Sequence, residues 1–176
     1  MADLVLAHTS QLDLAVRAEA RELLYAVFDD LTEDDWEHCL GGMHALVREG
    51  AQLVGHASVV QRRLLYRGRA LRAGYVEGVA VHPDHRRRGH AAAMMAAVEQ
   101  VARSAYDVAA LGATDEAVDV YVGRGWRLWA GPSWALTPSG VQRTEDDDGA
   151  IYVLPLSVDL DVREPLTCDW RDGDVW

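Results

Sequence analysis

The sequence contains no lysine, and all seventeen of its permanently basic residues are arginine. Without a lysine side chain the protein cannot form a lysine Schiff base or attach pyridoxal phosphate, and it cannot build a lysine-dependent nucleotide phosphate loop. Composition alone therefore excludes several enzyme classes.

Cysteine is also scarce, with only Cys39 and Cys168 in 176 residues. Two cysteines provide neither a disulfide framework nor a zinc site between them, so two ordinary thiols are the preferred interpretation. Neither lies in a motif that suggests a covalent acyl-enzyme. We therefore expect no metal cofactor and no covalent enzyme intermediate.

Long hydrophobic runs are missing as well. The longest, residues 91–98, falls far short of the about 20 residues that span a bilayer, and the first residues lack the basic segment of a signal peptide. These features favour a cytoplasmic protein with no membrane partner. With 49% hydrophobic residues the chain can bury a substantial core, and we expect a single domain over residues 1–176.

The charge balance points to a cationic partner. The formal net charge is −11 at pH 7, whereas binding to a phosphate backbone depends on a concentrated basic surface. Nucleic acid is therefore not expected as a partner. An acidic protein instead attracts cations.

The order of predicted elements gives a mixed α/β fold. Ser10 and Thr32 are plausible helix N-caps, the second in a capping box with Asp35. Short turns separate the early strands, which favours an antiparallel meander. Strands are predicted over residues 4–7, 43–49, 52–66, 70–81, 107–111, 126–136 and 151–156, the sixth of them broken by Gly131-Pro132. Later helices are predicted after Gly89 and over residues 115–122.

The segment 77–91 is the most informative. It reads as an apolar strand, a proline-marked turn and then Arg86-x-x-Gly89-x-Ala91, which opens an alanine-rich helix. A glycine lets the backbone approach a ligand, and a helix N-terminus offers unpaired N–H groups and a partial positive charge. The pattern is typical of a phosphate site, although a solvated basic turn explains the loop equally well when it is taken alone.

A second motif follows about thirty residues later: Ala117-x-x-x-Tyr121-x-x-x-Gly125-Trp126. On a helix Ala117 and Tyr121 share a face, and Gly125 ends the helix before the next strand. A buried tyrosine that merely packs the helix is the alternative interpretation.

The two motifs together resemble the GCN5-related N-acetyltransferases. This resemblance implies a mixed, mostly antiparallel sheet flanked by helices, with acetyl-CoA as co-substrate. It also places Tyr121 beside the coenzyme A sulfur, where a phenol can protonate the departing thiolate. The residues that it implies for the cofactor are Val79, Ala80, Val81, Arg86, Arg87, Arg88, Gly89, His90 and Ala91.

A narrower resemblance, to the aminoglycoside 2'-N-acetyltransferases, rests on residues 34–45, 72–81, 146–149 and 168–176. It implies acetylation of the 2'-amine of aminoglycosides by direct transfer in a ternary complex, antibiotic resistance, a homodimer, and a C-terminal tail that contributes to the substrate site. Clustered carboxylates suit such a polycation. The implied substrate contacts are Asp30, Asp35, Glu77, Gly78, Gly112, Asp147, Asp174 and Trp176.

Two groups are candidates for the catalytic base. Glu77 lies among apolar neighbours on the cofactor strand, where desolvation is able to raise its pKa. The carboxylate of Trp176 is the rival, and both can share the task. We also expect the N–H of Val79 to face the thioester oxygen, while the amides of residues 87–91 hold the pyrophosphate.

One position departs from the narrower resemblance, because Gly112 stands where a serine is expected after Leu111. A side-chain contact is lost there, which leaves the drug range open. Two other functions remain: an acetyltransferase for a cell-wall amino sugar or another cytoplasmic amine, and a non-catalytic acyl-CoA-binding module. The second needs only the glycine loop, so Glu77 and Tyr121 argue against it.

Overall fold

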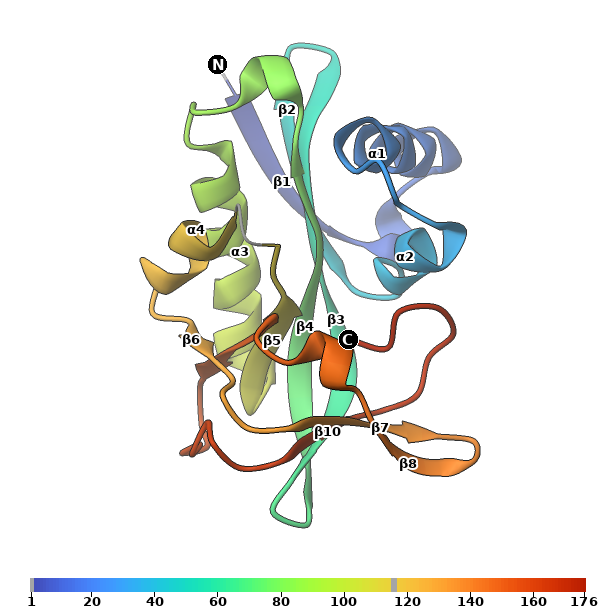
Figure 1. Ribbon diagram of the computed structural model, residues 1–176. Coiled ribbons are helices and arrows are strands. Elements are labelled where there is room, and N and C mark those ends of the chain that lie inside the picture. The colour runs from blue at the N-terminus through green and yellow to red at the C-terminus, as the bar shows by residue number, and fades with distance from the viewer. Residues whose placement is uncertain (1, 115–116) are drawn as a thin grey trace. The chain divides into compact units, whose positions relative to one another are not determined.

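The computed structural model describes residues 2–114 and 117–176 and contains two compact units (Figure 1). Unit 1 consists of Met1–Val60 and Val76–Val101, and unit 2 of Gln61–Tyr75 and Ala102–Trp176. Two long strands, β3 (Gln52–Tyr66) and β4 (Arg69–Val81), contribute one end to each unit.

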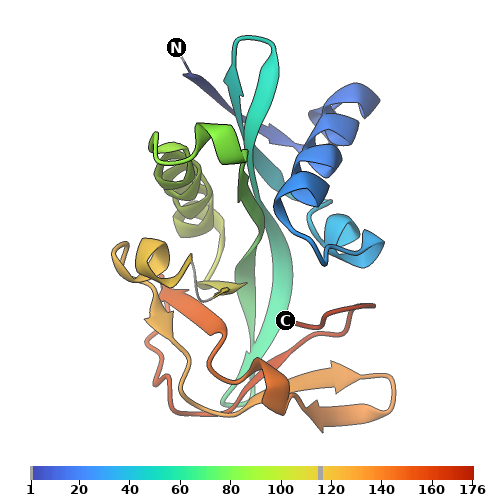
Figure 2. The ribbon, with the colours of Figure 1, turned by 45° about the horizontal axis from the view of Figure 1, so that its top comes forward.

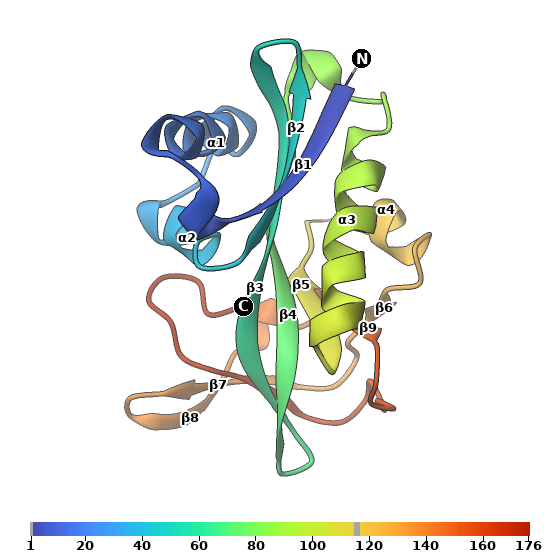
Figure 3. The same cartoon turned by 180° about the vertical axis from the view of Figure 1, so that it is seen from behind.

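Unit 1 is a sheet with helices on both faces. Strands β1 (Ala2–His8) and β2 (Met43–Glu49) pair antiparallel, and β2 pairs antiparallel with β3. The helices α1 (Leu14–Val27) and α2 (Glu33–His38) cover one face, and α3 (His90–Ala105) covers the other (Figures 1 and 3). The predicted meander is confirmed, and β2 and β3 have the predicted bounds.

The core beneath α1 and α2 brings together residues from both helices and from the strands. Its members are Leu12, Ala20, Leu23, Leu24, Trp36, Cys39, Leu46, Leu53 and Ala80. Ala80 is buried there whereas its neighbours Val79 and Val81 are half-buried, as expected when successive side chains of a strand point to opposite faces. The side chain of Ala80 thus belongs to the core, and only its main chain is available to a cofactor.

The two predicted N-caps had different outcomes. Thr32 caps α2 in the predicted capping box, with its hydroxyl accepting from Asp35 N. Ser10 does not cap α1, because it lies in a short 3-10 helix, Thr9–Gln11. The cap of α1 is Asp13, whose Oδ1 accepts from Val16 N at 2.8 Å. A carboxylate beside the helix start favours this later beginning.

Unit 2 has the strand order β6-β9-β5-β4-β3-β10-β7-β8. The β4–β5 and β7–β10 pairs are parallel, and the β5–β9, β6–β9, β7–β8 and β3–β10 pairs are antiparallel. The remaining elements are β5 (Val108–Gly112), α4 (Val118–Val122), β6 (Arg127–Leu128), β7 (Ser133–Thr137), β8 (Gly140–Arg143), β9 (Ile151–Pro155) and β10 (Leu166–Cys168).

Unit 2 corrects the later strand predictions. The strand predicted over residues 126–136 with a break at Gly131-Pro132 is observed as two strands, β6 and β7, with residues 129–132 between them. The hairpin β7–β8, the orange pair of arrows in Figure 2, and the short β10 were not predicted. The predicted helix 115–122 is represented by α4, and its residues 115 and 116 lie outside the described part of the chain. Within the described residues, no helix has the length and apolar character required to cross a membrane.

Candidate active site

The glycine loop of unit 1 joins β4 to α3. A 3-10 helix, Pro83–His85, precedes it, and two of its residues have positive φ: Arg87 at 60° and Gly89 at 84°. Such a conformation is unusual for arginine and is concentrated at functional sites. The carbonyl of Gly89 accepts from Ala93 N and so opens α3, whose first-turn N–H groups have no partner inside the helix. This is the arrangement of a phosphate-binding helix start.

Glu49, at the end of β2, fastens this loop. Its Oε2 lies 3.1 Å from His85 Nδ1 and 3.0 Å from Arg88 Nη1, and its Oε1 lies 2.8 Å from His90 Nε2. The hydrogen bond from His90, together with Arg88 and His85, holds the pKa of Glu49 below its usual value. Two of the predicted cofactor residues, Arg88 and His90, thus direct their side chains to Glu49. Sequence reasoning missed Glu49, which belongs to no motif.

The centre of β4 carries Glu77, Gly78 and Val79, all half-buried. Gly78 has a φ of 57°, which only glycine adopts readily. A Cβ at this position would lie 2.8 Å from Cys39 Sγ. The Gly78 carbonyl is 2.8 Å from His56 Nδ1, a contact that the sequence did not predict.

The two acidic residues predicted near α2 have unequal settings. Asp30 is exposed between α1 and α2. Asp35 is half-buried, and its Oδ2 accepts from both the N–H and the hydroxyl of Thr32 at 2.8 Å. Asp35 therefore stabilises the start of α2, whatever else it contacts.

Tyr121 of unit 2 is buried on α4, with its ring centroid 6.1 Å from that of Trp126. Burial raises the pKa of its hydroxyl to about 12. Its carbonyl accepts from Arg124 N and Trp126 N, and Gly125 has a φ of 92° in the turn that follows α4. The helix ends at Val122, earlier than the motif predicted, and the next strand begins at Arg127, one residue after Trp126. The phenol is therefore a protonated group with a hydrogen to donate.

The C-terminal tail of unit 2 is tightly held. Trp176 is buried, and its Nε1 donates to Thr144 Oγ1 at 2.9 Å. Arg62 Nη2 donates to Val175 O at 2.7 Å, and Arg171 Nη2 donates to Trp176 O at 2.8 Å. Sequence reasoning did not predict that these two arginines hold the tail.

The predicted substrate residues of unit 2 lie around this tail. Trp176 N donates to Asp174 Oδ1 at 3.2 Å. Burial and the charge of Asp174 raise the pKa of Asp147 above its usual value. A Cβ added to Gly112 would lie 3.8 Å from Tyr75 Oη and 3.9 Å from the carbonyl carbon of Trp176. The four predicted residues of this unit, Gly112, Asp147, Asp174 and Trp176, are thus brought into one acidic region.

The acidic run before Gly149 is divided between two tasks. Asp148 forms an ion pair with Arg143 and accepts from Ser133 N at 3.1 Å. The hydrogen bond from Arg143 lowers the pKa of Asp148 to about 2. Asp148 therefore ties the β7–β8 hairpin, whereas Asp147 is left to the acidic region.

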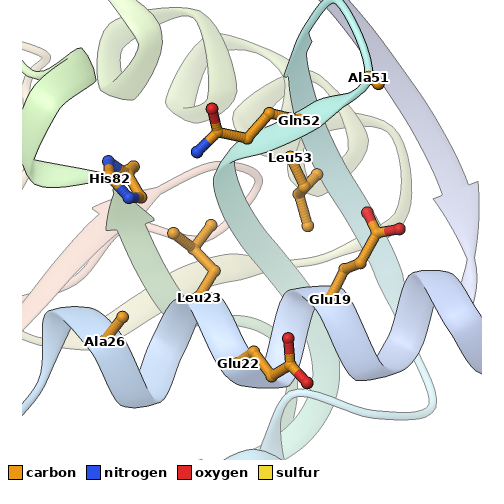
Figure 4. A pocket seen from close by; sticks show the side chains of 8 residues that line it. All are labelled: Glu19, Glu22, Leu23, Ala26, Ala51, Gln52, Leu53 and His82. Carbon is orange, nitrogen blue, oxygen red and sulfur yellow. The ribbon is translucent and has the colours of Figure 1, made fainter.

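Neither a metal site nor a further predicted site is found in the described residues. No group of three or more His, Cys, Asp or Glu residues in the described parts of the chain is arranged to hold a metal ion. A hollow of about 290 Å³ in unit 1 lies between α1, the start of β3 and the end of β4 (Figure 4). None of its lining residues is a predicted site residue: Glu19, Glu22, Leu23, Ala26, Ala51, Gln52, Leu53 and His82.

A strand with a positive-φ glycine that leads into a helix start with unpaired amides, and a buried protonated tyrosine further along the chain, are the features expected of an acyl-CoA-dependent transferase. Comparison with known protein families supports this class, because the family model described as "Acetyltransferase (GNAT) domain" matches residues 16–129. The chain belongs to this GNAT acetyltransferase family, whose members use acetyl-CoA as co-substrate. The predicted family and fold class are confirmed.

A curated relative carries the comparison further. The aminoglycoside 2'-N-acetyltransferase of Mycolicibacterium fortuitum is 52% identical over 176 residues, covering 97% of this chain and 90% of the relative. An acyl-CoA N-acyltransferase from Pseudomonas aeruginosa matches with a TM-score of 0.63 at 14% identity, covering 87% of this chain and 99% of that one. Escherichia coli ElaA matches with a TM-score of 0.59 at 19% identity, covering 75% and 91%. The two structures support the fold alone.

Proposed function

We propose that this protein transfers the acetyl group of acetyl-CoA to the 2'-amine of aminoglycosides and thereby confers resistance to them. The 52% identity to the Mycolicibacterium fortuitum enzyme over 97% of the chain supports this substrate. The observation in the structure that carries the proposal is the acidic region of unit 2. Asp147 and Asp174 lie close enough for the charge of one to raise the pKa of the other, and such a pair favours a ligand with several ammonium groups.

On the cofactor side, we assign the pyrophosphate to the main-chain amides of residues 87–91 at the start of α3. Glu49 binds the side chains of Arg88 and His90. These two residues therefore contact the pyrophosphate through their main-chain amides. Arg86 and Arg87 are exposed and add positive charge near the phosphates. The pantetheine runs along Val79, Ala80 and Val81, with the Val79 N–H directed at the thioester oxygen.

We assign the proton transfers to three groups. Glu77 takes a proton from the substrate ammonium, because only the neutral amine attacks the thioester carbonyl. The Trp176 carboxylate is the second candidate for this task. Tyr121 protonates the departing thiolate, and its raised pKa keeps it protonated until then. The amine nitrogen bonds directly to the acetyl carbon as the carbon–sulfur bond breaks, without an acyl-enzyme.

We assign substrate binding to the residues that the narrower resemblance implies. Asp30, Asp35, Glu77 and Gly78 belong to unit 1, and Gly112, Asp147, Asp174 and Trp176 to unit 2. This proposal treats residues 1–176 as one acetyltransferase domain whose tail completes the substrate site. We further propose a cytoplasmic homodimer that binds neither nucleic acid nor membrane. Light scattering tests the dimer, and cell fractionation tests the location.

The test is regiochemical. The enzyme is expected to release coenzyme A thiol with gentamicin, tobramycin and neomycin, which carry a 2'-amine, and not with kanamycin A or amikacin, which carry a 2'-hydroxyl. All five are polycations, so charge does not separate them, whereas a hydroxyl has a pKa too high for a carboxylate base. Two-dimensional NMR should place the acetyl group on the 2' nitrogen. Acetylation at another nitrogen would contradict the assignment and leave the family intact.

A further inference from the structure

A chain of three side chains in unit 1 ends on the main chain next to the proposed base. Thr9 Oγ1 lies 2.8 Å from His44 Nε2, His44 Nδ1 lies 3.0 Å from His56 Nε2, and His56 Nδ1 lies 2.8 Å from Gly78 O. Both histidines are fully buried. A buried polar chain of this kind needs every donor matched to an acceptor.

Only one arrangement of protons satisfies the chain when both rings are neutral. A carbonyl only accepts, so His56 Nδ1 must carry a hydrogen and donate it to Gly78 O. His56 Nε2 is then an acceptor, and His44 Nδ1 must donate to it. His44 Nε2 is left to accept from the hydroxyl of Thr9 at 2.8 Å. The Gly42 carbonyl, 3.2 Å from the same hydroxyl oxygen, already accepts from Thr9 N and does not need this hydrogen. All three donors therefore point toward Gly78.

The surroundings keep both rings neutral. Burial, followed by the nearby His56, His8 and Arg17, lowers the pKa of His44 to about 3. Burial also lowers the pKa of His56 to about 4, although the bond to Gly78 acts in the opposite direction. Thr9 is itself fixed, since its Oγ1 accepts from Gly41 N at 2.8 Å. The chain thus has one proton arrangement at any pH near neutrality.

The last bond of the chain sets the direction of a neighbouring N–H. The described chain contains no cis peptide, and in a trans peptide the carbonyl and the following N–H point in opposite directions. The Gly78 carbonyl points to His56, whose ring lies beside Trp36 of α2, with 6.2 Å between ring centroids. The N–H of Val79 therefore points away from this core.

We propose that His56, held by His44 and Thr9, is a positioning residue that aims the Val79 N–H at the thioester oxygen. The proposal rests on the proposed acetyl transfer. Support of this kind is needed because glycine permits several orientations of its peptide planes, and Gly78 with φ 57° has no Cβ to restrict them. A donor held in place before the reaction is worth more than one that must be oriented during it.

Asparagine and glutamine form a matched pair for testing this geometry. An asparagine amide nitrogen occupies the position of Nδ1, whereas a glutamine amide nitrogen lies near that of Nε2. His56→Asn therefore retains a donor to Gly78 O, and His56→Gln loses it. The same rule applies to His44, which donates through Nδ1 to His56. Glutamine is closer to histidine in size, so a role in packing alone predicts the reverse order.

We expect His56→Gln to lower kcat by about a hundredfold, the effect of removing one oxyanion donor, with the KM for acetyl-CoA changed by less than about twofold. His56→Asn should retain kcat within about fivefold of the wild type. His44→Gln should fall below His44→Asn for the same reason. Equal losses in the two His56 variants, or a better glutamine variant, would overturn the proposal.

A measurement on the wild type separates this proposal from the proposed function. The amide resonance of Val79 should shift more with acetyl-CoA than with coenzyme A. Absence of that difference in the wild type would refute the role of Val79 and with it the proposed site. A difference that persists in His56→Gln would refute only the role of His56.

The tautomers provide a test that needs no variant. Nitrogen-15 spectra of histidine-labelled protein at pH 7 should show two neutral rings with the hydrogen on Nδ1. The opposite tautomer is the usual one for an exposed imidazole, so the signature is specific. A charged ring or an Nε2–H tautomer at His56 would overturn the proposal.

Discussion

The main chain at Gly78 in unit 1 and the main chain of the tail in unit 2 are both held by side chains, but one support is neutral and the other is charged. Gly78 O accepts from His56, a ring whose pKa burial lowers to about 4. In the tail, Arg62 and Arg171 donate to the carbonyls of Asp169, Asp174, Val175 and Trp176. Both guanidinium groups also lie over the ring of Tyr75.

The difference follows from what each region has to bind. A neutral support fixes the strand that we assign to the uncharged thioester without adding a charge nearby. In the tail, the arginines bind main-chain carbonyls and so fold an acidic segment, while Asp174 remains close enough to Asp147 to raise its pKa. A guanidinium is suited to this because it presents several donors in a fixed plane.

Loss of the tail that the two arginines hold should have the largest effect on activity. Deletion of residues 172–176 should lower kcat/KM for aminoglycosides by about a hundred- to a thousandfold, because it removes Asp174 and Trp176 from the substrate site. Binding of acetyl-CoA, measured by calorimetry, should be unchanged, since the glycine loop belongs to unit 1. Arg171→Met should show the same pattern more weakly. Arg163→Met, which removes an exposed arginine paired with Asp161, is the control, and full activity of the truncated protein would contradict the role of the tail.

The leaving group is the next test. Tyr121→Phe should lower kcat by about a hundredfold while acetyl-CoA affinity stays the same, because the ring remains and only the proton donor is lost. Single-turnover kinetics measures the chemical step directly. Tyr152→Phe removes the hydroxyl of another buried tyrosine in unit 2 and should have little effect. An unchanged chemical step in Tyr121→Phe would assign the proton to water.

A change at the cofactor loop should affect acetyl-CoA binding and not aminoglycoside binding, the reverse of the tail deletion. Glu49→Gln should weaken acetyl-CoA binding about tenfold, the consequence of losing a charged hydrogen-bond acceptor for Arg88 and His90, and should leave aminoglycoside binding unaltered. Glu19→Gln, which removes the partner of Arg48 in the same unit, is the matched control. If the two variants bind acetyl-CoA equally well, Glu49 does not hold the loop in its binding form.

The smallest expected effect concerns His44 and His56, the neutral support of Gly78, and the dependence of the free energy of unfolding on pH. The folded pKa values of about 3 for His44 and about 4 for His56 lie below the ordinary 6.5, so the unfolded chain takes up protons that the folded one excludes. The contribution of the two neutral histidines to the free energy of unfolding is complete above pH 6.5 and is lost as pH falls toward 4. The slope is about 1.4 kcal/mol per pH unit for each histidine. Urea unfolding at pH 7, 6 and 5 should show a shallower decline in the His44→Asn/His56→Asn double variant.

Sequence reasoning succeeded where a local pattern determines the structure. The limits of β2 and β3 follow from their apolar runs and turn residues, the capping box at Thr32 needs only four residues, and the turn after Tyr121 follows from Gly125. The glycine loop was predicted from its own sequence for the same reason, whereas Gly78 was named only as a contact that the narrower resemblance implies.

It failed where partners lie far apart in the chain. Glu49 binds a loop about forty residues later, Arg62 binds the tail more than a hundred residues later, and His56 binds Gly78 on the next strand. No spacing rule connects such residues, because the fold alone brings them together. The strand β10 was not predicted because it has only three residues. Ser10 and Asp13 are equally suitable as N-caps, so the sequence alone does not show that Asp13 caps α1.

The two glycines of the proposed substrate site differ in what they allow during evolution. At Gly78 a positive φ and the close approach of Cys39, His56 and Leu24 forbid any side chain. At Gly112 a Cβ would meet Tyr75 and Trp176 only at ordinary contact distances of 3.8 and 3.9 Å. A single substitution can therefore place a side chain at position 112, which the narrower resemblance implies as a substrate contact, whereas position 78 accommodates only glycine.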